Sequence, residues 1–116
     1  MSRFLPADHS KGDERTIGGY AAVHARPAAF EGRDGFSYSV EILADTSDDP
    51  AGAFGAFFLF IRWKRFGEQE VEGHLESVFL AHGPDADSAR TALGAMPVEA
   101  VQRHLDALIL GRTESE

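Results

Sequence analysis

The sequence predicts a single α+β domain, in which a four-stranded antiparallel sheet carries two C-terminal helices on one face. Segments with strand-like alternation come first, and helical spacing of apolar residues begins only after Gly83-Pro84. The 116 residues are enough for one core that buries on the order of 65% of the unfolded surface. A meander is the simplest connectivity for such a sheet.

Composition narrows the classes of function. The formal net charge is −8, which argues against binding nucleic acid because that contact normally needs a basic stripe. With no cysteine there is no disulfide, thiolate zinc site or cysteine nucleophile. No apolar run resembles a signal peptide or approaches the roughly 18 residues of a membrane helix. We therefore expect a soluble, cytoplasmic protein that binds neither membrane nor nucleic acid.

The chain divides into an arm, a domain and a tail. Residues 1–16 are polar and without periodicity, so we expect a flexible arm there, followed by one domain over residues 17–111 and a frayed tail over 112–116. Weak alternation predicts a first strand over Ile17–Arg26, which Pro27 ends. Clean alternation predicts a second strand over Phe36–Ala44.

Two helices are predicted after the sheet. Asp85 or Asp87 can cap the first of them, along which Ala89 and Leu93 recur at helical spacing. The second starts at Pro97, a residue suited to the first helical position. Its apolar stripe consists of Val98, Val101, Leu105 and Leu108.

The segment from Phe54 to His82 organises the rest of the chain. It predicts two long strands joined near Gly67, and a three-residue loop there gives a register in which paired residue numbers add to an even total. That register places Leu75 and Phe79 in the row of Ile61. We therefore expect the helices to cover the row made of Phe57, Leu59, Ile61 and Trp63.

The opposite face of the predicted hairpin is then left open. Four apolar side chains, Phe58, Phe60, Val78 and Leu80, form a patch there of a few hundred Å². Monomeric proteins rarely expose such a patch without a use for it. The sequence thus predicts an interaction surface and a homodimer.

A polar row on the same face is the candidate for ligand binding. Glu72, His74 and Glu76 point the same way along a strand, and a histidine among carboxylates suits zinc, iron or manganese. The candidate ligand residues are Arg62, Lys64, Glu72, His74, Glu76, Glu41 and His24. Because the cations of this row compete for the same carboxylates, we favour a solvated salt ladder over a metal site, and acid/base chemistry by His74 with Glu76 stays open.

Two stretches, RPAAFEGRDGFSYSVEI and FFLFIRWKRFGEQEVEGHLES, resemble segments of a set of small uncharacterised bacterial proteins. The resemblance runs from Gly19 to Ile109 and implies no activity and no site residues. No serine lies in a G-x-S-x-G elbow, and no cofactor or catalytic residue is predicted. We favour a non-enzymatic interaction module that self-associates through a sheet face, with a small-ligand or metal-binding protein as the alternative.

Overall fold

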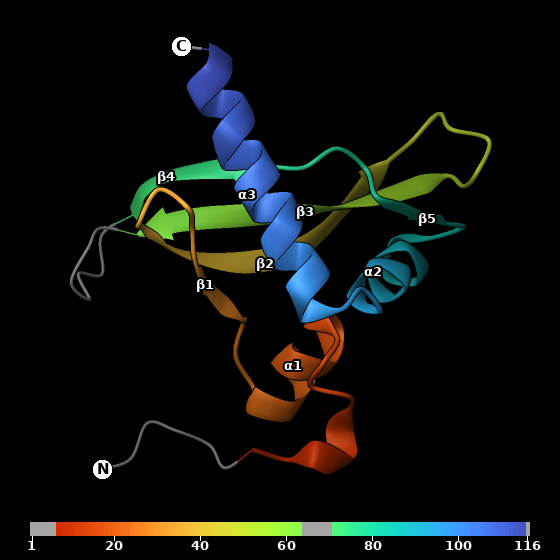
Figure 1. Cartoon of the computed structure of the whole chain (residues 1–116). Helices are drawn as coiled ribbons and strands as arrows, with labels where there is room; N and C mark the ends of the chain where they lie inside the picture. The colour runs from red at the N-terminus through yellow and green to blue at the C-terminus, as the bar shows by residue number, and fades with distance from the viewer. Residues whose placement is uncertain (1–6, 64–70, 116) are drawn as a thin grey trace.

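The computed structural model describes residues 7–63 and 71–115, which form an α+β fold. Figure 1 shows the helices packed against a twisted sheet, with α3 crossing it. The elements are the 3-10 helix η1 (His9–Lys11), α1 (Ile17–His24), β1 (Ala29–Glu31), β2 (Ser37–Thr46), β3 (Phe54–Trp63), β4 (Val71–Glu76), β5 (Ala81–Gly83), α2 (Ala86–Gly94) and α3 (Val98–Ser115). The predicted fold class is confirmed, including two C-terminal helices that pack on the sheet.

The sheet is an antiparallel meander in the order β1-β2-β3-β4. β2 and β3 form its centre and pair along their whole length, from Ser37↔Trp63 to Thr46↔Phe54. β5 also pairs with β3, at Phe54↔Gly83, beyond the end of β4. β4 and β5 therefore follow one another along the same edge of β3, where one long strand was predicted.

The first predicted strand is wrong, because Ile17–His24 forms the helix α1. The Thr16 hydroxyl accepts a hydrogen bond from the Gly19 amide at 3.1 Å, which caps the helix. Ala25 ends it in the left-handed conformation, with φ 53°. Ile17 and Val23 are buried, so tertiary packing here outweighs the low helix propensity of two glycines.

The ends of the chain carry more structure than the sequence predicts. Within the expected flexible arm, the Asp8 amide donates to the Val23 carbonyl at 2.9 Å, and η1 follows at His9–Lys11. Farther along, the Ile17 amide donates to the Met96 carbonyl at 2.8 Å. At the other end α3 stays helical through Ser115, where we expected a frayed tail.

The first C-terminal helix is capped as predicted, whereas the second begins at Val98, one residue later than the predicted start at Pro97. The Asp85 carboxylate caps α2 by accepting from the Ser88 amide at 2.7 Å, and this contact lowers the pKa of Asp85. α3 starts just after Pro97, whose carbonyl accepts from Val101 at 3.2 Å.

The helices bury one face of the sheet, which we call the covered face. Its β3 residues Ala56, Phe58 and Phe60 are 0% exposed. They pack with Tyr38 and Val40 of β2. The helices contribute Ala89, Leu93, Val101, Leu105 and Ile109 to the same core. The predicted face was therefore wrong, since the helices cover the Phe58 and Phe60 row and not the row of Phe57, Leu59, Ile61 and Trp63.

The predicted register is also wrong. Phe60 pairs with Leu75 and Ile61 pairs with His74, so the paired numbers add to odd totals. A bulge between Arg62 and Trp63 gives the even pair Trp63↔Val71 only beyond that point. The odd register places Leu75 on the covered face, against the core. The predicted loop around Gly67 lies outside the described residues.

Candidate functional site

The second face of the sheet carries an apolar stripe, and we call it the open face. Along β3 the stripe consists of Phe57, Leu59, Ile61 and Trp63, and Leu43 of β2 lies beside Phe57. These five side chains are partly buried. α2 and α3 contribute their buried residues to the covered face, and none of the three described α-helices packs on the stripe. Alternation along β3 thus gives the sheet two apolar faces, of which the helices use one.

A break between β4 and β5 extends the stripe with Phe79. The Ser77 hydroxyl accepts from the Phe58 amide at 2.9 Å, and the Leu80 amide donates to the Ala56 carbonyl at 2.8 Å. Val78 and Phe79 lie between these two contacts and leave the ladder, so Val78 is 76% exposed. The sequence did not reveal this break.

The Phe79 ring packs on the backbone of Gly55, where a Cβ atom would come within 2.4 Å of it. Its centroid lies 6.0 Å from the ring of Phe57 and 5.9 Å from that of His82. Glycine is required at position 55 because the aromatic ring occupies the space of a side chain. The ring therefore continues the apolar stripe past the end of its β3 residues.

Polar side chains flank the stripe on both sides. Leu59 pairs with Glu41 on β2 and with Glu76 on β4. Two residues farther along β3, Ile61 pairs with Ser39 and with His74. Glu41, His74 and Glu76 are exposed. The open face thus carries a carboxylate on each side of Leu59 and an imidazole two residues away on β4.

The predicted interaction surface is wrong for Phe58 and Phe60, which are 0% exposed. Phe58 and Phe60 are in the core, because they alternate with the open stripe. Leu80 is partly buried against the core, and Val78 alone of the four is strongly exposed. The apolar side chains of the open face are instead those one residue away along β3.

The predicted polar row is split between the two faces and α1. Arg62 lies on the covered face opposite Tyr38, whereas Glu41, Glu72, His74 and Glu76 are exposed. Glu41 and Glu76 are two strands apart, a separation of roughly 10 Å. His24 lies on α1, and Lys64 is outside the described residues. Within residues 7–63 and 71–115, no three His, Asp or Glu side chains are placed to hold a metal ion.

His24 belongs to a surface cluster at the N-terminal end of the chain. Its Nε2 lies 2.9 Å from one oxygen of Glu14, and Nε2 of His9 lies 3.3 Å from the other. The hydrogen bond with His24 lowers the pKa of the Glu14 carboxyl. This cluster ties the segment around η1 to α1.

Arg62 lies at one end of the covered face. Its guanidinium lies 4.6 Å from the ring of Phe36, and Nη1 is 3.6 Å from the Asp34 carboxylate. The Tyr38 hydroxyl donates to the same carboxylate at 2.6 Å. The buried Nε of Arg62 has no hydrogen-bond partner. Arg62 is thus a covered side chain that neutralises Asp34 at the β1–β2 turn.

The pKa of Tyr38 predicts that the free energy of unfolding falls at alkaline pH. Burial, with the hydrogen bond to Asp34, raises the pKa of Tyr38 from 10.0 to about 12. Its stabilising effect is therefore complete below pH 10 and disappears as the pH rises through 12. We expect Tyr38→Phe to lower the free energy of unfolding by about 1–2 kcal/mol below that range. The measurement is urea unfolding of both proteins across this pH range, and a difference that stays constant would contradict the assignment.

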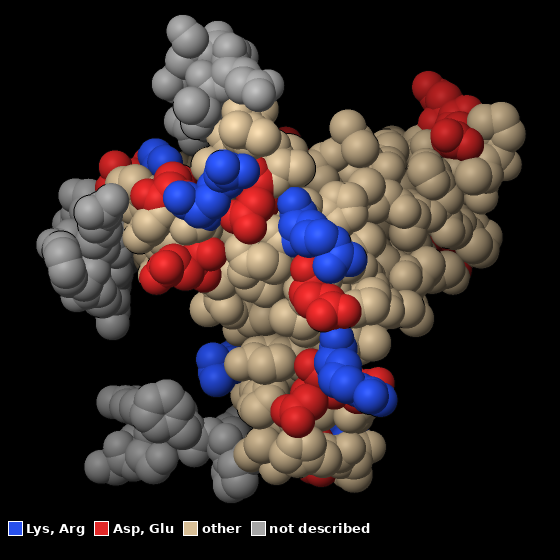
Figure 2. Space-filling view, viewed as in Figure 1, with Lys and Arg blue, Asp and Glu red and all other residues tan. Residues whose placement is uncertain are grey.

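The side of the molecule that carries the helices bears charges of both signs, and neither sign dominates. Figure 2 shows Lys and Arg interleaved with Asp and Glu over the helix-bearing side.

Among the described helices, none has the length and apolar character needed to span a membrane. The fold is that of an α+β protein in which the described helices pack on one side of the sheet.

No protein-family model, curated protein or solved structure matches the chain. The expected kinship with small bacterial proteins therefore stays a prediction.

Proposed function

We propose that this protein is an interaction module that self-associates through the open face of its sheet. The apolar stripe carries the proposal, because five partly buried apolar side chains and Phe79 lie together on a face that no described α-helix covers. Burying apolar area in the contact between two copies contributes about 25 cal/mol per Å² to the free energy of association. Two such sheets pack face to face about 10 Å apart, as in a β-sandwich.

A second copy fits the stripe when a two-fold axis runs across the strands opposite Phe60. Ile61 of one copy then meets Leu59 of the other. In the same arrangement Trp63 meets Phe57 of the second copy. Large side chains thus face large side chains along the whole stripe, and the contact is isologous.

The flanking polar residues support the same axis. The axis across the strands places His74 opposite Glu76 of the second copy, and symmetry repeats this pair. The reason is that His74 pairs with Ile61 and Glu76 pairs with Leu59, which lie one residue to either side of Phe60. An imidazole N–H donates to a carboxylate whether or not the ring is charged. An axis along the strands would instead bring Glu41 against Glu76 of the second copy, which like charges oppose.

Exchanging the two polar residues tests the proposal. His74→Glu places two carboxylates together in each half of the interface, so we expect the dimer to dissociate at least about tenfold more readily, measured by sedimentation against protein concentration. The double variant His74→Glu with Glu76→His recreates the pair in reverse. It is expected to restore the wild-type dissociation constant.

The matched control is Ala107→Glu, which adds the same single negative charge at an exposed position of α3 on the helix-bearing side. It should leave association unchanged. A double variant that associates no better than His74→Glu would refute this axis. Association that none of the open-face changes weakens would refute the use of the face itself.

A further inference from the structure

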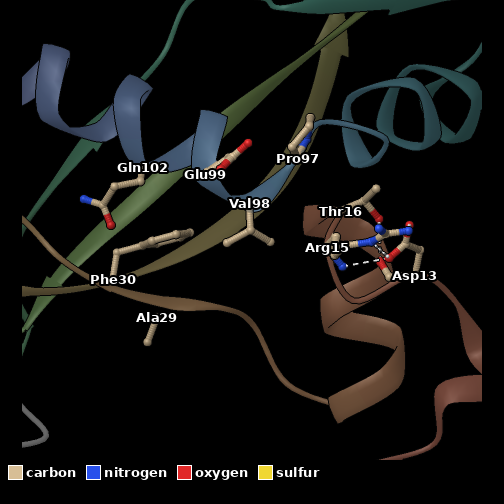
Figure 3. Close-up of a pocket in the computed structure, with 9 residues that line it drawn as sticks. All are labelled: Asp13, Arg15, Thr16, Ala29, Phe30, Pro97, Val98, Glu99 and Gln102. Atoms are coloured by element: carbon tan, nitrogen blue, oxygen red, sulfur yellow. Dashed lines mark hydrogen bonds and ion pairs between the residues drawn. The ribbon is translucent and has the colours of Figure 1, made fainter.

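A groove of about 840 Å³ runs beside the edge strand β1. Figure 3 shows its walls, which come from β1, from the loop before α1 and from the start of α3. Phe30, Pro97 and Val98 supply its apolar surface. Asp13, Arg15, Glu99 and Gln102 supply polar groups. The groove is separate from the open face, because Phe30 belongs to the covered side.

The backbone of β1 faces this groove with amide and carbonyl groups that do not bond to β2. β1 pairs on one side only, with β2. The Ala28 carbonyl accepts from Val40 at 3.3 Å, and the Gly32 amide donates to Phe36 at 2.9 Å. Since ladder groups alternate in an antiparallel pair, the amide and carbonyl of Ala29 point away from β2.

Two observations agree with that direction. The carbonyl of Glu31, next but one along the strand, accepts from the Gln102 side chain of α3 at 3.1 Å. In Figure 3 the Ala29 methyl group points away from the other groove residues, so its backbone forms the wall. Neither backbone group of Ala29 bonds to any residue of the described chain.

The charges of the groove favour a basic ligand. Arg15 is already paired with Asp13, at 3.1 Å between Nε and Oδ1. Glu99 is exposed and is not among the ion pairs formed by the described residues. The unpaired charge at the groove is therefore a carboxylate.

We propose that the β1 edge binds an extended peptide segment as an added strand, with an apolar side chain and a basic one two residues away. Ala29 exchanges main-chain hydrogen bonds with the segment. The apolar side chain lies between Phe30 and Val98. The basic one, on the same side of the added strand, reaches Glu99.

The test uses a fluorescein-labelled peptide, Thr-Val-Thr-Lys-Thr, and its counterpart with Glu in place of Lys. Fluorescence anisotropy should show saturable binding of the Lys peptide that is at least about tenfold tighter than binding of the Glu peptide. Ala29→Pro removes the exposed donor and leaves the β1–β2 ladder complete. It is expected to abolish binding.

Two further variants keep the result decisive. Ala29→Val retains the amide and directs its side chain away from the groove, so it should bind as the wild type does. Glu99→Lys should reverse the preference between the two peptides, which tests the proposal even if Ala29→Pro does not fold.

Lack of saturable binding, or equal binding to wild type and a folded Ala29→Pro variant, overturns the proposal. So does equal affinity for the two peptides. If neither peptide binds and Ala29→Pro lowers the mass in solution, a second copy of the chain occupies this edge instead.

Discussion

Replacing Phe60 by Ala is expected to lower the free energy of unfolding by about 3–5 kcal/mol. The ring is 0% exposed and belongs to the core that the sheet shares with the helices. Its removal leaves a cavity that the strand on each side prevents from collapsing, since Phe60 is paired with Val40 and with Leu75. Urea unfolding measures the loss directly.

Phe57→Ala is the matched control, because the same substitution is made in the same strand on the opposite face. Phe57 is partly buried and touches Phe79. At protein concentrations that keep the chain monomeric, we expect a loss of about 1–2 kcal/mol. Equal losses for the two variants would contradict the assignment of the faces.

Gly55→Ala is expected to destabilise the protein by about 1–3 kcal/mol, although alanine normally suits a strand better than glycine. The added methyl group would lie 2.4 Å from the Phe79 ring. The ring must therefore shift away from position 55. Thermal or urea unfolding gives the loss.

A double-mutant cycle identifies the cause. In a Phe79→Ala background the space above Gly55 is free, so Gly55→Ala should cost much less there. Gly73→Ala is the control, because the nearest atom to its new methyl group is Nη2 of Arg62 at 3.8 Å. If the Gly55 substitution cost the same with and without the Phe79 ring, the proposed contact would be ruled out.

Local patterns predicted the elements of the sheet and helices well where the period was unambiguous. The alternation of Tyr38, Val40 and Ile42 predicted β2, and the Asp85 cap and Pro97 predicted both C-terminal helices. Ile17–His24 was mistaken for a strand because its apolar residues favour no side of the helix. What fixes α1 is the Thr16 cap and a close approach of Gly18 to Gly94, and such tertiary contacts leave little trace in a local pattern.

The faces of the sheet could not be predicted for a related reason. Both rows of β3 are apolar, so hydrophobicity alone does not decide which one the helices cover. Arg62 suggested that its row faces solvent, yet Phe36 and Asp34 accommodate it at the end of the covered face. The break at Val78 separates Phe79 from the register of Leu75, and the prediction had assumed that both follow one alternation.

The mass in solution of the wild type beside Leu59→Asp tests the central proposal most directly. Leu59 lies in the middle of the apolar stripe and is only partly buried, so the aspartate can remain hydrated in a folded monomer. Sedimentation equilibrium should give a dimer of the 12.6 kDa chain for the wild type and a folded monomer for Leu59→Asp. A monomeric wild type, or a Leu59→Asp variant that remains a dimer, would contradict self-association through the open face.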